Sequence, residues 1–169
     1  AQLTEVVGLA DQLHTAGIDY IGINGAGVGS LNITDAQAAT LVGAGLAFSA
    51  GDEISVSATG THLSTSLQDL QKLGVDAVSV AGAGLTVDLG GVDSAGGLSG
   101  SGIPGFVATS DTNGDGETNG ADIDVTLNLS GADLQAQLSE VVGLADELQA
   151  AGIDYIGING GEAGSLSIT

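Results

Sequence analysis

Twelve residues, DTNGDGETNGAD at 111–122, have the side chains and the spacing of a calcium-binding loop. Counted from Asp111, oxygen-bearing side chains stand at the first, third, fifth, ninth and twelfth positions. Gly116 stands at the sixth position, where a loop that wraps one ion turns sharply, and the main-chain carbonyl at the seventh adds a ligand. The predicted calcium ligands are Asp111, Asn113, Asp115, Glu117, Asn119 and Asp122.

Calcium suits this donor set because the ion takes six to eight oxygen ligands in a flexible geometry. Carboxylates crowded into one short loop repel one another unless a cation lies between them. The alternative is a solvated polar loop that holds no ion.

The pattern D-x-N-x-D-G-x-x-N-x-x-D resembles the calcium loop of dockerin modules. The resemblance covers the twelve residues of the loop and implies the ion site alone. A dockerin has two such loops, each leading into a helix. Here we find one loop, and residues 123–129 alternate in polarity as a strand does, so partner binding of the dockerin kind is not implied.

The charge of the chain favours cations as partners. There are 21 Asp and Glu against a single Lys or Arg, which gives a formal net charge of −20. Nucleic acid is excluded as a natural partner, because such binding depends on Lys and Arg that neutralise phosphates. Hydrophobic residues make up 43% of the chain, which is too many for a disordered acidic tail. With no Cys, the chain has no disulfide framework and no thiolate site.

Residues 1–34 and 136–169 are two copies of one segment, displaced by 135 residues and matching at 26 of 34 positions. A repeat of this length is considered before any fold is assigned, because it decides how the chain is divided. We interpret the sequence as one full period and the start of the next, excised from a longer protein with several periods.

Polarity patterns predict the elements within the period. Apolar residues at helical spacing predict helices at 1–17, 35–46 and 66–73, the second capped by Thr34 or Asp35 and the third by a capping box of Thr65 and Gln68. Strand–helix–strand–strand blocks are expected at about 53–89 and 123–168. The predicted fold class is α+β: two such blocks form small mixed sheets covered by helices, as part of a tandem repeat array.

The expected organisation has five parts. They are the start of one repeat at 1–34 (a helix and two strands), a helix and the first block at 35–89, a Gly/Ser-rich linker at 90–110, the calcium loop at 111–122, and the second block at 123–169, which repeats 1–34. The N-terminal copy lacks the strand that precedes the helix in the C-terminal copy, so its sheet is expected to present an unpaired edge.

Glycine ends three of the predicted helices, at Gly17, Gly74 and Gly152, where a left-handed residue is expected. An aspartate follows each glycine two residues later, at 19, 76 and 154. We interpret these aspartates as turn residues that bond locally. Asp52 and Glu53 are likewise interpreted as a solvated turn.

An enzyme is not expected, because no nucleophile stands beside a base in a recognised motif. His14 and His62 are the only imidazoles, and Gln149 replaces His14 in the second copy. A hydrolase that uses His62 with one of the serines beside it is the alternative, although no G-x-S-x-G turn frames the pair.

The whole chain resembles the repeat modules of giant bacterial surface proteins and adhesins exported by type I secretion. The resemblance rests on long near-identical repeats, acidity, absent Cys and the calcium loop, and it implies a protein that leaves the cell unfolded and folds outside on meeting calcium. We expect an extracellular structural or adhesive repeat, not inserted in a membrane. We expect it to assemble head to tail with neighbouring copies into filaments, which calcium promotes. The alternative is a calcium-dependent module that binds glycans or proteins.

Overall fold

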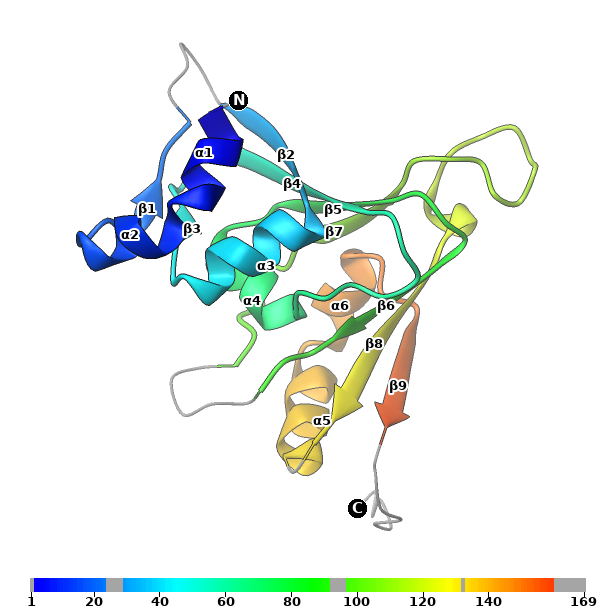
Figure 1. The fold of residues 1–169 in the computed structure, drawn as a ribbon. Coiled ribbons are helices and arrows are strands. Elements are labelled where there is room, and N and C mark those ends of the chain that lie inside the picture. Colours follow the sequence, from blue (N-terminus) through cyan, green and yellow to red (C-terminus); the bar gives the residue numbers. More distant parts are fainter. Residues whose placement is uncertain (1, 24–28, 92–96, 132, 160–169) are drawn as a thin grey trace.

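A computed structural model describes residues 2–23, 29–91, 97–131 and 133–159 of the chain. Figure 1 shows helices gathered beside strands that run through the middle of the molecule. The helices are α1 (Gln2–Gly8), α2 (Ala10–Thr15), α3 (Asp35–Gly43), α4 (Leu67–Leu73), α5 (Leu134–Gly143) and α6 (Ala145–Ala150), with a 3-10 turn η1 (Gly120–Asp122). The strands are β1 (Tyr20–Ile21), β2 (Ser30–Thr34), β3 (Ala47–Phe48), β4 (Glu53–Ala58), β5 (Ala77–Val80), β6 (Gly84–Asp88), β7 (Gly105–Ala108), β8 (Asp124–Ser130) and β9 (Tyr155–Asn159).

The strands form three sheets, with orders β1-β3, β2-β4-β5-β7 and β6-β8-β9. Every strand pair among the described residues is parallel. The expectation of mixed sheets is therefore wrong in this respect. Between paired strands the chain returns through a helix or a long loop, and such a crossover delivers the next strand in the same direction.

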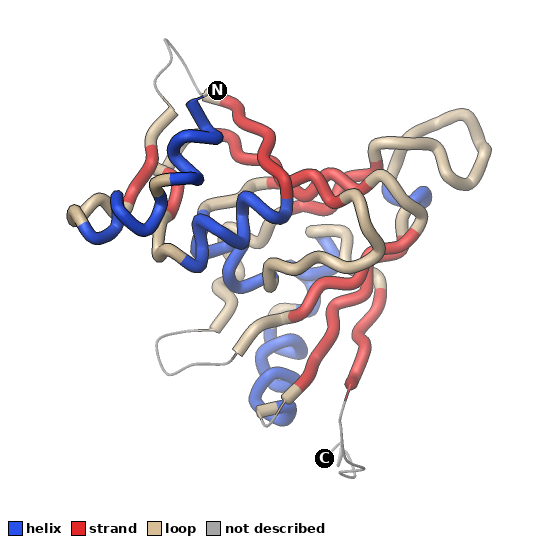
Figure 2. Tube along the Cα trace, in the orientation of Figure 1, coloured by secondary structure: helices blue, strands red, loops and turns tan. Residues whose placement is uncertain are grey.

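The expected α+β content, with helices that cover small sheets, is confirmed. Helices α3 and α4 lie beside the four-stranded sheet, and α5 packs on β8 of the three-stranded sheet (Figures 1 and 2). The two predicted blocks do not keep separate sheets, however. Strand β6 follows β5 in the chain but pairs with β8 in the other sheet. The first predicted block therefore contributes strands to both sheets.

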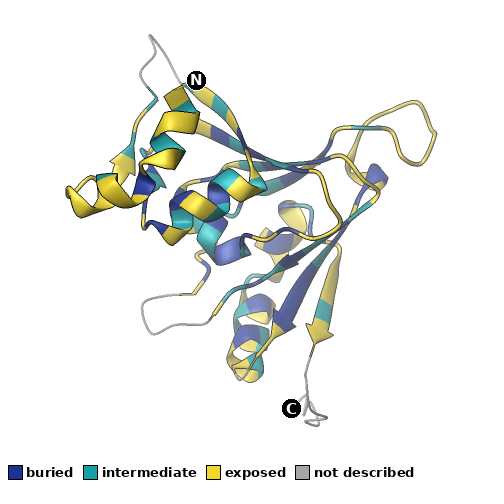
Figure 3. Cartoon of the chain, viewed as in Figure 1, coloured by how far each residue is buried: buried dark blue, intermediate teal, exposed yellow. Residues whose placement is uncertain are grey.

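The core is aliphatic, as the composition predicts. Strands in the middle of the molecule are buried, whereas α1 and α2 contribute one fully buried residue, Ala10 (Figure 3). Leu67, Leu70 and Leu73 place one face of α4 in the core, at 1% exposure or less. A face of three leucines at helical spacing stabilises α4 by burial of apolar surface, although the helix is short.

Local capping sets where two of the helices begin. Thr34, one of the two predicted caps, caps α3 and forms a capping box with Gln37: its hydroxyl accepts the N–H of Gln37, and the Gln37 side chain accepts the N–H of Thr34. The cap predicted for α4 is wrong by one residue, because Ser66 accepts the Asp69 N–H. Thr65 instead donates its hydroxyl to the Asp35 carboxylate at 2.9 Å, a partner thirty positions away that local rules cannot see.

The range expected to be a linker, 90–110, contains structure. Strand β7 pairs with β5, and Leu98 is buried. The Gln71 side chain of α4 donates to the carbonyls of Ser99 and Ser101, at 2.9 and 3.0 Å. Residues 92–96 of this range lie outside the described part of the chain. Glycine-rich sequence can therefore lie flat against a helix, because the missing side chains let the main chain make the contacts.

The left-handed glycines are confirmed, with φ of 82° at Gly17, 83° at Gly74 and 87° at Gly152. Each ends a helix and turns the chain into an extended segment, where a side chain at positive φ would be strained. The helix predicted at 1–17 is broken at Leu9, whose φ is −112°, so that α1 and α2 follow one another as two short pieces.

Candidate metal centre

The predicted calcium loop connects β7 to β8 and projects from the molecule beside the 3-10 turn (Figures 1 and 3). Residues 111–121 are exposed, whereas Asp122, the last predicted ligand, is 1% exposed. The loop therefore presents most of its oxygen atoms to solvent and is anchored at one end by a buried carboxylate.

Asp111 sits at the centre of the turn. Its two carboxylate oxygens accept the N–H groups of Gly114 at 2.6 Å and Gly116 at 2.8 Å. Both glycines have positive φ, 78° and 89°, and no atom lies within 4 Å of a Cβ built at either. Both positions thus favour glycine because of their backbone conformation and not because of crowding. Gly116 is the glycine expected at the sixth position of a calcium loop.

The next predicted ligands repeat one local contact. Asn113 Oδ1 accepts the N–H of Asp115 at 2.9 Å, Asp115 Oδ1 accepts that of Glu117 at 2.8 Å, and Asn119 Oδ1 accepts that of Ala121 at 2.8 Å. These contacts hold each side chain against the main chain of the loop two residues further on. Each carbonyl or carboxylate oxygen retains a lone pair, and Asp115 retains its second oxygen for another partner.

Asp122 closes the loop. Its Oδ1 accepts the N–H groups of Thr112 at 2.9 Å and Asn113 at 3.2 Å, and its Oδ2 accepts that of Asn119 at 2.8 Å. The Asn119 N–H is the largest cause that holds the pKa of Asp122 below its ordinary value. One ionised carboxylate therefore ties the first residues of the loop to the last.

The four carboxylates of the loop do not converge on one point. Across the described residues, no three acidic or histidine side chains gather closely enough to hold a metal. The amide oxygens of Asn113 and Asn119 and the carbonyl of Glu117 would have to complete a coordination shell. This set consists of oxygen atoms alone, which fits a hard cation such as Ca²⁺ and not a soft one.

The two histidines pair with aspartates. His62 Nε2 lies 3.4 Å from Asp88, which also accepts the side-chain N–H of Asn128 at 2.6 Å. His14 Nδ1 lies 3.2 Å from Asp19. In the part of the chain that the structure describes, no serine hydroxyl bonds to His62.

Sequence reasoning missed the role of three aspartates. Asp52 accepts the N–H of Ile23 at 2.9 Å, Asp76 that of Ile54 at 2.8 Å, and Asp154 that of Val125 at 2.8 Å. Each carboxylate thus holds the main chain of a segment 22 to 29 positions away, so the expectation of local turns is wrong for these residues. For Asp76 and Asp154 the recurrence of Asp after G-[IV] was the available signal, whereas Asp52 does not follow this pattern.

Comparison of the chain with protein families, with curated proteins and with solved structures finds no match. None of the helices within the described ranges combines the length and the apolar character needed to cross a bilayer.

Proposed function

We propose that this chain is a calcium-binding structural repeat of a secreted surface or matrix protein, extracellular in location, with residues 111–122 as its ion site. The observation that carries the proposal is the loop itself, in which Asp111, Asn113, Asp115, Asn119 and Asp122 are held by main-chain N–H groups around two left-handed glycines. The net charge of −20 supports it, because a bound cation relieves self-repulsion of the compact state.

The position of the loop gives calcium a structural task. Strand β7 belongs to the four-stranded sheet, whereas β8 is the middle strand of the three-stranded sheet. An ion held between Asp111 and Asp122 would fix the path from one sheet to the other. The repeated segments at the two ends of the chain support the same reading, because a protein built from such periods gains rigidity from each fixed junction.

Calcium should therefore raise the stability of the folded chain. A ligand that binds the folded state alone contributes about 2.7 kcal/mol at a hundredfold excess over Kd. For a chain of this size that corresponds to a rise of about 5–10 °C in Tm. The test is thermal unfolding of the full chain in excess calcium and in chelator, with isothermal titration to count the ions bound. Equal melting temperatures and no binding heat would refute the calcium site.

Matched variants separate ion binding from loss of charge. Asp115→Ala removes a predicted ligand and should abolish most of the calcium-dependent rise in Tm. Asp133→Ala removes the same charge at an exposed position whose side chain makes no capping bond, and it should keep the rise. If both variants lose it equally, the effect belongs to net charge and not to the loop.

A calcium-dependent module that binds glycans or proteins is the second candidate. Tyr20 and Tyr155 favour it, because these equivalent tyrosines are 69% and 56% exposed, and exposed aromatic rings supply contact area to ligands. A glycan array in calcium and in chelator distinguishes the two candidates, since a structural repeat should bind no glycan in either condition.

A further inference from the structure

The two copies of the repeated segment bury different sets of apolar residues. Five apolar residues that are exposed in one copy are buried or half-buried at the equivalent position of the other, 135 positions away. Two exposed residues belong to the N-terminal copy and three to the C-terminal copy. The pairs, with the exposed residue first, are Leu9 and Leu144, Ile18 and Ile153, Val142 and Val7, Ile156 and Ile21, and Ile158 and Ile23.

In the N-terminal copy, β3 covers the side that the C-terminal copy exposes. Ala47 donates its N–H to the Asp19 carbonyl at 2.9 Å, and Ser49 donates its N–H to the Ile21 carbonyl at 2.8 Å. The equivalent carbonyls in the C-terminal copy belong to Asp154 and to Ile156 of β9. Strand β9 lies at the end of its sheet and pairs with β8 alone among the described strands, so no described strand lies beside its second edge.

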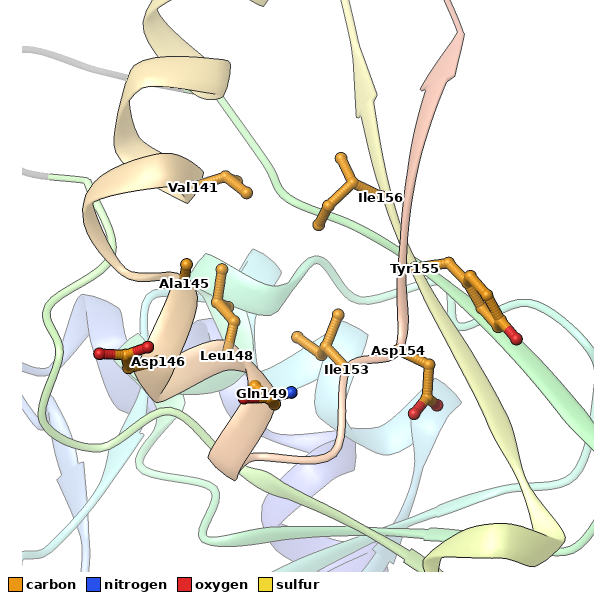
Figure 4. A pocket seen from close by; sticks show the side chains of 9 residues that line it. All are labelled: Val141, Ala145, Asp146, Leu148, Gln149, Ile153, Asp154, Tyr155 and Ile156. Carbon is orange, nitrogen blue, oxygen red and sulfur yellow. The ribbon is translucent and has the colours of Figure 1, made fainter.

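A hollow adjoins this open edge. It has a volume of about 280 Å³ and lies between α5, α6 and β9. Figure 4 shows Val141, Leu148 and Ile156 pointing toward one another across it, while Tyr155 points away. In the N-terminal copy the equivalent residues, Val6 and Ile21, line a hollow together with Phe48 of β3. Phe48 has no counterpart among the residues that line the C-terminal hollow.

We propose that the free edge of β9 and the adjoining hollow bind the α3–β3 segment, residues 35–48, of a second copy of this chain when that segment is released from its own N-terminal copy. The inference rests on the structural-repeat part of the proposed function and does not require the ion. The register follows from the N-terminal copy, where Tyr20 pairs with Ala47 and Ile21 with Phe48. Tyr155 then pairs with Ala47 of the second copy, and Ile156 with its Phe48.

In a single chain the α3–β3 segment is already covered by that chain's own N-terminal copy. Docking therefore replaces residues 2–23 of one molecule by residues 137–158 of the next. Such a contact is heterologous, because it joins two different surfaces, and it continues into open filaments unless the rotation closes a ring.

The test releases the N-terminal copy in the full chain. Ala10 is 3% exposed and lines a surface with Thr40 of α3, while Ile21 lies against β3. The double variant Ala10→Glu with Ile21→Asp places two charges in this contact and should free α3 and β3. Light scattering during size-exclusion chromatography, in chelator and at physiological salt, should then show oligomers, whereas the unaltered chain should be monomeric.

The matched control changes the equivalent residues of the C-terminal copy. Ala145 lines the hollow, and both Ala145 and Ile156 are exposed, so Ala145→Glu with Ile156→Asp should leave a folded monomer. Combined with the N-terminal double variant, it should abolish the oligomers. Oligomers that persist in the combined variant would overturn the proposal, because they would come from unfolded chain. A monomeric N-terminal double variant would overturn it as well.

Disulfide trapping reads the register. The chain has no Cys, so Ala47→Cys and Tyr155→Cys, added to the N-terminal double variant, introduce its only thiols. They should link neighbouring molecules, whereas Ala47→Cys with Gln135→Cys, at an exposed position on α5, should not. Equal linkage by both pairs would contradict the register. All of these measurements are made in chelator, so failure of the calcium site leaves them unaffected, and calcium titration of the monomer does not depend on docking.

Discussion

The sequence Tyr-Ile-Gly-Ile occurs at 20–23 and again at 155–158, with the same residues before it, yet it forms strands of different length. At the N-terminus it gives the two-residue strand β1, beside the short β3. At the C-terminus it lies in the five-residue strand β9, beside the seven-residue β8. Identical local propensity therefore gives a strand whose length is set by its neighbour.

The residues that follow the helices of the two copies differ in the same way. Ala151 and Ile153 are buried near Phe106, whose N–H donates to the Ala151 carbonyl at 2.7 Å. The equivalent Ala16 and Ile18 are exposed. The two copies therefore differ in their neighbours: the C-terminal copy packs on β7 and β8, which precede it in the chain, whereas the N-terminal copy packs on α3 and β3, which come after it.

The largest expected difference in stability between the two copies comes from substituting one pair of equivalent isoleucines. Ile153 is 7% exposed and Ile18 is 44% exposed. Ile153→Ala should lower the free energy of unfolding by about 2–4 kcal/mol, because it leaves a cavity in the core. Ile18→Ala should lower it by about 1 kcal/mol or less. Urea denaturation of the two variants measures the difference, and equal losses would mean that both copies are packed alike in solution.

Matched aspartates should give a smaller effect. Asp154→Ala removes the acceptor of the Val125 N–H, and Val125 is fully buried, so the cost should be about 1–2 kcal/mol. Asp19→Ala removes an exposed pair with His14 and should change stability by about 0.5 kcal/mol at most.

Two further variants serve as controls for this contact, in which an aspartate carboxylate accepts a main-chain N–H from a distant segment, here called the aspartate clasp. Asp154→Asn keeps an oxygen acceptor and should recover part of the loss, as judged by urea denaturation. Asp76→Ala should behave as Asp154→Ala does, because Asp76 holds Ile54 in the same way. A neutral Asp76→Ala would show that the clasp matters at one site alone.

Lowering the pH should have the smallest effect on stability. It should act through Asp35, at the start of the helix α3 on which the N-terminal copy packs. Burial raises the pKa of Asp35, but hydrogen bonds from Ser64 and Thr65 outweigh it and hold the pKa below the ordinary 3.8. A carboxyl with a lowered pKa stabilises the fold above its ordinary value, and this contribution is lost as the pH falls through the folded-state pKa.

The measurement compares the unaltered chain with Asp35→Asn. The difference in unfolding free energy should be about 0.5 kcal/mol near neutral pH, since water screens a partly exposed carboxylate. It should shrink as the pH falls below about 4. A difference that stays constant across this range would assign the effect of the substitution to shape and not to charge.

Local signals were enough to predict several elements. Thr34 was one of the two N-caps predicted for α3 from neighbouring residues, and the alternation from 123 to 129 predicts β8 nearly residue for residue. Strand direction was not predictable in this way, because the same alternation suits parallel and antiparallel neighbours. Strand β7 was missed because its four residues follow a long Gly/Ser-rich stretch and are too few to show a period in polarity.

The candidate site divides similarly. Spacing alone identified the loop and its left-handed Gly116, because both depend on neighbours within twelve residues. Burial of Asp122 depends on where η1 sits relative to β7, which the sequence does not reveal. The clasps of Asp76 and Asp154 join segments that only the fold brings together.

The two tyrosines give this protein an optical property. It has no tryptophan, so Tyr20 and Tyr155 account for its intrinsic near-ultraviolet fluorescence. One ring lies on β1 and the other begins β9, at the two ends of the repeat. Emission from the folded chain thus comes from strands β1 and β9 and reports little of the core. When β9 docks on another molecule, the change in the fluorescence lifetime or anisotropy of Tyr155 can be followed without any attached dye.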